Sequence, residues 1–170
     1  IIGITPSGLF VEHGEAIAEF ICKWIMDIGG TVVLVPHVYR RGVSDLDAAR
    51  QIVTRIIQLC PSVENSVVVL EDELTARQCK SLISTLDLLV SFRMHAGIAA
   101  VSSGVPVLLF SYSHKSHGIF DDMLGLGDYV VGVAEISGDL LKRKCAELLN
   151  RRTEIAAFLE RRVRTLREKA

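Results

Sequence analysis

The chain has 170 residues, of which 49% are hydrophobic and 23% charged, which is enough for one sizeable core and too little for two. No apolar run approaches the ~18 residues that cross a bilayer, so the sequence predicts a soluble, cytoplasmic protein. The net charge of −1 and the aromatic content of 6% argue against nucleic acid as a partner.

The first half of the chain alternates short apolar strands with helical patterns. Runs of β-branched residues predict strands, and apolar residues that recur every three or four positions predict helices. Ser44 with Asp47, and Thr75 with Gln78, have the spacing of helix-capping boxes. The predicted elements are a strand over Ile1–Ile4, a helix from Gly14 to Gly29, a strand over Thr31–Pro36, a helix from Ser44 to Cys60, a strand over Ser66–Leu70 and a helix over Thr75–Thr85.

The second half continues this alternation. Its predicted strands do not alternate between apolar and polar residues and are separated by helices, which indicates parallel β-α-β units covered on both faces. We therefore predict one doubly wound, mainly parallel, Rossmann-like α/β domain over residues 1–170. The elements are strands over Asp87–Ser91, Val105–Phe110 and Tyr129–Val133, and helices over Met94–Ser103, Ile119–Leu124, Ser137–Leu149 and Thr153–Leu166.

Polar residues gather in the loops that follow the predicted strands. Ligands of doubly wound sheets bind outside the carboxyl ends of the strands, and four of the five histidines fall in these loops, the exception being His13. Arg93 and His95 stand where a strand gives way to a helix, whose free N–H groups near Met94 attract anions. A site for a small phosphate or carboxylate is predicted there.

Neither disulfides nor a metal are expected. The four cysteines are widely spaced within apolar segments, which favours packed thiols over bridges or ligands. His114 and His117 are three residues apart, but the sequence places no third ligand near them.

Three short motifs follow one another in the second half. They are Arg93-Met-His95, then Gly104-Val-Pro-Val, then Ser111-Tyr-Ser-His-Lys115. This series resembles the Arg-x-His, Gly-x-Pro and Tyr-x-x-Lys series of the polysaccharide pyruvyl transferases, and Pro36-His37 followed by Asp47 is similar to a weaker upstream element. The resemblance implies a fold like the C-terminal lobe of a GT-B glycosyltransferase. The absence of a starting methionine fits the C-terminal half of a longer, two-lobed enzyme.

The resemblance also implies an activity. Such enzymes move the enolpyruvyl group of phosphoenolpyruvate onto two hydroxyls of a sugar in a cell-surface polysaccharide, giving a pyruvate ketal, and no step requires a cofactor or metal. Arg93 then offers a bidentate fork to the carboxylate or phosphate. His95 is the candidate general acid or phosphate donor, because an imidazole with the ordinary pKa of about 6.5 exchanges protons near neutral pH. The other substrate-binding candidates are Met94 through its N–H, Lys115, Tyr112, Ser111, His37, Ser7 and Gly8.

Local explanations stay open for these residues. Arg93 can pair with Asp87 or Asp72, and His95 can be an ordinary helix-start residue. His37 suits loop packing as well as a ligand contact. Plain turns are the alternative for Ser7 and Gly8, and a solvated turn lysine for Lys115.

The end of the chain is basic. Residues Ser137 to Ala170 carry ten Lys and Arg against five Asp and Glu, whereas the preceding part carries nine against fifteen. The last predicted helix can lie on the inner face of an anionic membrane that carries a lipid-linked saccharide acceptor. Packing on the missing N-terminal lobe is the favoured alternative. The apolar stripe of this helix is Ile155, Phe158, Leu159, Val163 and Leu166.

Two other functions remain possible from the sequence. In a GT-B glycosyltransferase or sugar-nucleotide epimerase lobe, the same helix start holds a nucleotide diphosphate, and Glu71-Asp-Glu73 contacts a ribose. A protein-binding module that keeps the sheet without catalysis is the non-enzymatic alternative.

Overall fold

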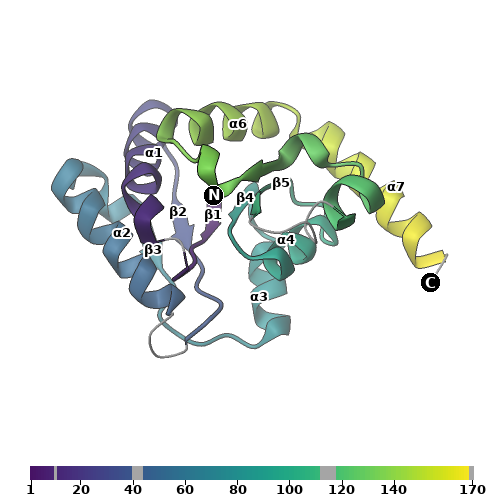
Figure 1. Ribbon diagram of the computed structural model, residues 1–170, viewed down its shortest axis with the longest axis horizontal. Coiled ribbons are helices and arrows are strands. Elements are labelled where there is room, and N and C mark those ends of the chain that lie inside the picture. Colours follow the sequence, from purple (N-terminus) through teal and green to yellow (C-terminus); the bar gives the residue numbers. More distant parts are fainter. Residues whose placement is uncertain (10, 40–43, 112–117, 169–170) are drawn as a thin grey trace.

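The computed structural model describes residues 1–9, 11–39, 44–111 and 118–168. Its centre is a six-stranded sheet in the order β3-β2-β1-β4-β5-β6, in which every neighbouring pair is parallel (Figure 1). The predicted strands are all present and differ from the prediction only at their ends. They are β1 (Ile2–Thr5), β2 (Val32–Leu34), β3 (Val67–Val69), β4 (Leu88–Ser91), β5 (Val107–Ser111) and β6 (Val130–Gly132).

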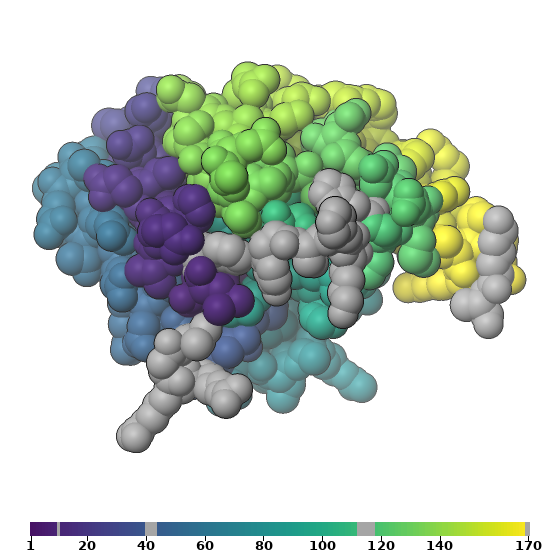
Figure 2. Space-filling view, in the orientation of Figure 1, coloured from purple at the N-terminus to yellow at the C-terminus, as the bar shows by residue number. Residues whose placement is uncertain are grey.

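Helices cover both faces of this sheet, as predicted for a doubly wound fold. Helices α1, α2 and α6 pack together on one face, and α3 and α4 on the other (Figure 1). Helix α7 follows α6 and forms the end of the molecule opposite α2 (Figure 2). The helices are α1 (Gly14–Ile28), α2 (Asp45–Leu59), α3 (Ala76–Ile83), α4 (Met94–Val101), α6 (Gly138–Asn150) and α7 (Arg152–Glu168). Shorter helical segments are η1 (Val11–His13), η2 (Pro61–Ser66), the π-helix η3 (Gly118–Met123), η4 (Gly127–Tyr129) and η5 (Val133–Glu135).

The core lies between the sheet and its two helical layers. All residues of β1, β4 and β5 are buried, which explains why these strands read as apolar runs without alternation. The rings of Phe92 and Phe110 stack with their centroids 4.9 Å apart. Phe92 directly follows β4, and Phe110 lies near the end of β5. Each buried ring of this kind stabilises the fold by roughly 1.5–3 kcal/mol relative to exposure.

Side-chain caps fix where two of the helices begin. The Ser44 hydroxyl accepts the N–H of Asp47 at 3.2 Å, and Thr75 with Gln78 forms a complete capping box. Both helix starts confirm the predicted positions. Gly29, with φ of 80°, ends α1 in a conformation that favours glycine.

The strand order reverses between β1 and β4. From β1 the chain first runs outward through β2 and β3, then returns to β4 on the other side of β1. The register pairs Thr5 with Ser91, so both strands end at the same level. This reversal is where doubly wound sheets bind ligands.

Within the described ranges, no helix has both the length and the apolar character required to span a membrane.

Candidate functional site

Two buried hydroxyls join the ends of β1 and β4. Thr5 Oγ1 lies 2.8 Å from Ser91 Oγ, and both residues are fully buried. Ser91 Oγ donates to the carbonyl of Arg93 at 2.8 Å and accepts its N–H at 3.2 Å. Because the single Ser91 proton is used on that carbonyl, Thr5 is the donor between the hydroxyls. The network fixes the backbone that leads into α4.

The carboxylate of Asp45, at the start of α2, ties three loops together. It is fully buried, and its Oδ1 accepts the N–H of Gly8 at 3.0 Å. Its Oδ2 accepts the N–H groups of His37 at 3.2 Å and Val38 at 3.0 Å. Both oxygens also accept from the guanidinium of Arg93. The loops after β1, β2 and β4 therefore meet at one charged group, whose burial is compensated by these donors.

Arg93 is directed toward this carboxylate. Its Nε lies 3.0 Å from Asp45 Oδ2, its Nη2 bonds Oδ1, and its side chain is 19% exposed. The pairing with Asp87 or Asp72 considered from the sequence is wrong, because Asp87 instead pairs with Arg152 and the amino group of Ile1. The sheet order explains the difference, since β4 and β2, which leads into α2, lie on the two sides of β1. Arg93 has five N–H donors, of which two are used on Asp45.

The beginning of α4 presents backbone N–H groups at the same edge. Arg93 occupies the N-cap position in an extended conformation, with φ of −125° and ψ of 114°, and its side chain makes no capping bond. Met94 begins the helix half-buried, and His95 follows it in an exposed position. The first N–H groups of a helix have no partner inside it, so those of α4 can take phosphate or carboxylate oxygens.

A groove of about 410 Å³ lies beside this helix start, between α3, α4 and the loop after β2. His37 and His95 both line it, together with Tyr39, Glu73 and Lys80. The Nδ1 of His37 is 3.1 Å from the carbonyl oxygen of Val35. The groove therefore brings two imidazoles from different loops to one surface.

Burial lowers the pKa of His37 below its ordinary value. The hydrogen bond to Val35 and the charge of Asp45 oppose this shift, while the positive charges of Arg93 and His95 add to it. The net direction favours the neutral imidazole.

The remaining predicted residues lie at the same edge or outside the described part. Ser7 is buried, and its hydroxyl accepts the N–H of Leu9 at 3.2 Å, while the N–H of Gly8 donates to Asp45. Ser111 is buried at the end of β5. Tyr112 and Lys115 lie outside the described residues, as do His114 and His117.

Sequence reasoning missed Asp45. Acidic residues are common directly after an N-cap, because the helix dipole stabilises their negative charge there. The position of Asp45 after Ser44 therefore does not by itself indicate a site. Asp47, which the resemblance singled out, is exposed, and its N–H is held by Ser44. The one feature of the sequence that could have indicated Asp45 is its position at the start of the helix that follows the loop after β2.

In the part of the chain that the structure describes, no three His, Cys, Asp or Glu side chains gather closely enough to hold a metal ion. The four cysteines are free, and Cys22, Cys79 and Cys145 are buried, as expected for packed thiols.

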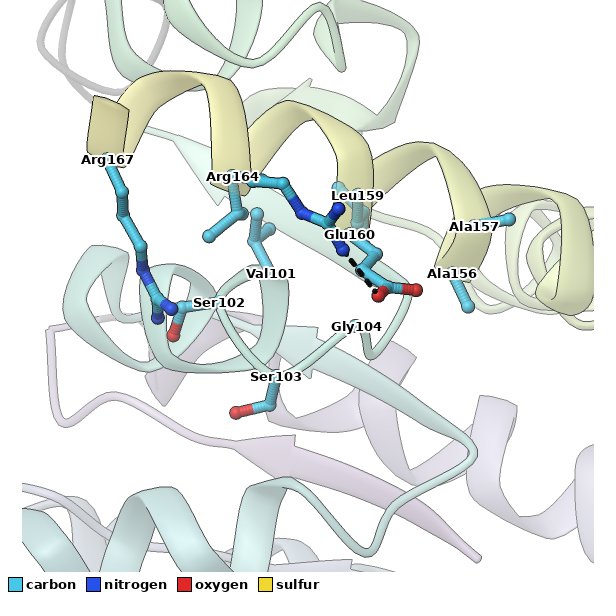
Figure 3. A pocket seen from close by; sticks show the side chains of 11 residues that line it. Val101, Ser102, Ser103, Gly104, Ala156, Ala157, Leu159, Glu160, Arg164 and Arg167 are labelled. Carbon is cyan, nitrogen blue, oxygen red and sulfur yellow. Dashed lines mark hydrogen bonds and ion pairs between the residues drawn. The ribbon is translucent and has the colours of Figure 1, made fainter. Parts of the chain in front are cut away.

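A larger cavity lies away from this edge. It has about 640 Å³ and separates α7 from the turn between α4 and β5. Figure 3 shows Arg164 and Arg167 of α7 over this turn, with Arg164 paired to Glu160 at 3.3 Å. Gly104 precedes β5, whereas Arg93 follows β4, so the cavity belongs to the opposite edge of the sheet. It is no part of the candidate site.

Helix α7 buries part of its apolar stripe within this domain. Ile155 and Leu159 are buried, while Phe158 is 36% exposed. Packing on a further lobe or on a membrane, the two interpretations of its basic surface, stays a prediction.

The strand order and the polar loops at its reversal define a Rossmann-like α/β lobe with a candidate ligand site at the switch point. A mutant O-GlcNAc transferase from Thermobaculum terrenum has a similar structure, with a TM-score of 0.66 and 12% identity over 96% of this chain and 31% of that one. The N-terminal domain of trehalose-6-phosphate phosphatase from Candida albicans follows, with a TM-score of 0.59 and 10% identity over 97% and 37%. The predicted likeness to a lobe of a GT-B glycosyltransferase is confirmed, and the chain spans about a third of these structures.

The sequence itself matches the polysaccharide pyruvyl transferase family over residues 5–114. This is more than half of the chain, which therefore belongs to that family, as the motifs predicted. The match includes Arg93, Met94 and His95 and ends one residue before Lys115. No curated protein sequence matches the chain.

Proposed function

We propose that this chain is the donor-binding lobe of a transferase that moves the pyruvyl group of phosphoenolpyruvate to a sugar of a cell-surface polysaccharide as a ketal. The observation that carries the proposal is the convergence of Arg93, His37, His95 and the start of α4 at the switch point. Membership of the pyruvyl transferase family supports it.

The site suits a small dianion. Asp45 uses two donors of Arg93, and the other three are proposed to hold the carboxylate of phosphoenolpyruvate. The phosphate is assigned to the uncapped N–H groups of α4, where the helix dipole favours negative charge. Lys115 and Tyr112 are proposed to assist the phosphate or the sugar.

His95 is proposed as the general acid. Its side chain is exposed at the second position of α4, next to the proposed phosphate site. A protonated imidazole there can protonate the methylene carbon and leave an electron-poor carbon for attack by a sugar hydroxyl. No metal or cofactor is required for this step.

One observation favours a second function, binding of a nucleotide diphosphate sugar. Of the acidic segment Glu71-Asp-Glu73, Glu73 lines the groove beside His37 and His95, where it can reach a ribose. Glu71 is instead paired with Arg50 at 2.7 Å. The similarity to an O-GlcNAc transferase is compatible with this alternative.

Calorimetric titration of the full-length protein separates the two functions. The proposal expects phosphoenolpyruvate to bind and a uridine diphosphate sugar to bind weakly. The reverse preference contradicts it. A crystal soaked with phosphoenolpyruvate then locates the two anionic groups relative to Arg93 and α4.

A further inference from the structure

The imidazole of His37 is held by its own backbone in one orientation. Its Nδ1 lies 3.1 Å from the carbonyl oxygen of Val35, and a carbonyl oxygen only accepts hydrogen bonds. The Nδ1 atom must therefore carry the proton of that bond. In the neutral ring, Nε2 then has a free lone pair, and the ring lines the groove.

The surroundings of His37 favour this neutral form. Burial lowers its pKa most, and the positive charges of Arg93 and His95 lower it further, against the opposing effects of Val35 and Asp45. These groups reach it from three elements: Asp45 from α2, Arg93 from the loop after β4, and His95 from α4. Glu73 and Lys80 line the same groove from the side of α3.

His37 and His95 thus differ in a way that suits opposite roles. His95 is exposed at a helix start, whereas His37 is half-buried with one nitrogen committed to the chain. Titratable groups in contrasting environments at one site are typical of acid and base pairs. We propose that His37 is the general base, and that its Nε2 takes the proton of the attacking hydroxyl of the acceptor sugar. This inference rests on the proposed function.

Both histidines take part in the proposed step. Protonated His95 gives a proton to C3 of phosphoenolpyruvate, and the C2–C3 π electrons form the new C3–H bond. The hydroxyl oxygen of the sugar bonds to C2, and its proton moves to Nε2 of His37. The bond between C2 and the phosphate oxygen then breaks, and its electron pair leaves with the phosphate. A second sugar hydroxyl bonds to C2 and its proton ends on the phosphate, while transfer of the His37 proton back to His95 resets the pair.

The first test is independent of turnover. Nitrogen NMR of the imidazoles in the full-length protein at pH 7.5 is expected to show a neutral His37 with its proton on Nδ1. A proton on Nε2 overturns the inference, because the ring then has no lone pair for the hydroxyl.

The second test uses His37→Asn, since the Asn amide can keep a donor for the Val35 carbonyl but has no basic nitrogen. Phosphate release from phosphoenolpyruvate is measured with a panel of methyl glycosides, and binding by calorimetry. We expect turnover to fall about a hundredfold or more, with the affinity for phosphoenolpyruvate within about threefold of the parent. The fall in kcat toward acidic pH, which reports protonation of the base, should disappear. His13→Asn is the matched control and should keep the parent rate.

Parent turnover in His37→Asn overturns the inference, and so does an equal loss of turnover and phosphoenolpyruvate affinity, which indicates a binding role. A parent protein that releases no phosphate with any glycoside contradicts the proposed function, and the base role falls with it. A His37 proton on Nε2 in an active parent contradicts the base role alone.

Discussion

Asp45 and Arg93 form a two-point ion pair across the switch point of the sheet, although 48 residues separate them in the sequence. The carboxylate is fully buried and also accepts the N–H groups of Gly8, His37 and Val38. Arg93 is thereby fixed beside the start of α4. The geometry of the site consequently depends on a residue that touches no proposed substrate atom.

Asp45→Asn should destabilise the protein strongly. The amide NH₂ of Asn would face N–H donors where a carboxylate oxygen now accepts, and Arg93 would lose its counter-charge. Breaking a buried pair in this way costs about 3 kcal/mol, at the lower end of the usual range because Arg93 is partly exposed. Urea unfolding measures the change. Asp47→Asn, an exposed change in the same helical turn, should cost less than about 1 kcal/mol, and equal losses would contradict the role of Asp45.

Ser91→Ala should also lower stability, by about 1–3 kcal/mol, because it removes the hydroxyl that pairs with the buried Thr5 side chain and with the N–H of Arg93. The comparison variant is Ser84→Ala, since the Ser84 hydroxyl bonds only the carbonyl of Ser81 at an exposed position. Urea unfolding of both variants should rank Ser91→Ala clearly below Ser84→Ala. Similar midpoints would show that the hydroxyl network contributes little.

Much of the fold is encoded in local patterns and could be predicted from the sequence. Buried parallel strands read as apolar runs, helices as periodic stripes, and the caps at Ser44 and Thr75 as short motifs. The edge of the sheet at which the candidate site lies followed from the general rule for doubly wound folds. The Asp45–Arg93 pair could not be predicted, because it depends on which helix start lies beside which loop after the chain has folded. The lowered pKa of His37 could not be predicted for the same reason, since its burial also depends on the folded structure.

Arg93→Lys is predicted to weaken phosphoenolpyruvate binding about tenfold, because a single ammonium cannot hold Asp45 at two points and also present a planar fork to a carboxylate. Calorimetry on the full-length protein measures the affinity. Arg50→Lys is the control, because Arg50 makes a similar two-point contact with Glu71 at an exposed position. Unchanged affinity in Arg93→Lys would remove Arg93 from the donor site.

His95→Gln should separate catalysis from binding. The Gln amide can still donate a hydrogen bond to phosphate but cannot transfer a proton, so turnover should fall about a hundredfold or more while phosphoenolpyruvate binding changes little. Phosphate release and calorimetry give the two quantities, and His13→Gln controls for the loss of a histidine elsewhere. Equal turnover in His95→Gln and the parent would exclude His95 as the acid.

The stability of the protein should depend on pH through His37. Burial lowers its pKa in the folded state below the value of about 6.5 expected in the unfolded chain. Between these two values the unfolded chain binds the proton and the folded protein does not, so stability rises with pH through this window. The contribution is complete above about pH 6.5 and is lost as the pH falls toward the folded pKa.

His37→Asn, which has no such group, should therefore lie furthest below the parent at pH 7.5 and approach it at pH 5. Urea unfolding at several pH values measures the difference, with the non-titrating Ser84→Ala variant expected to keep a constant offset. A difference that widens toward pH 5 would mean that the folded environment favours protonated His37, which is incompatible with its proposed role as a base.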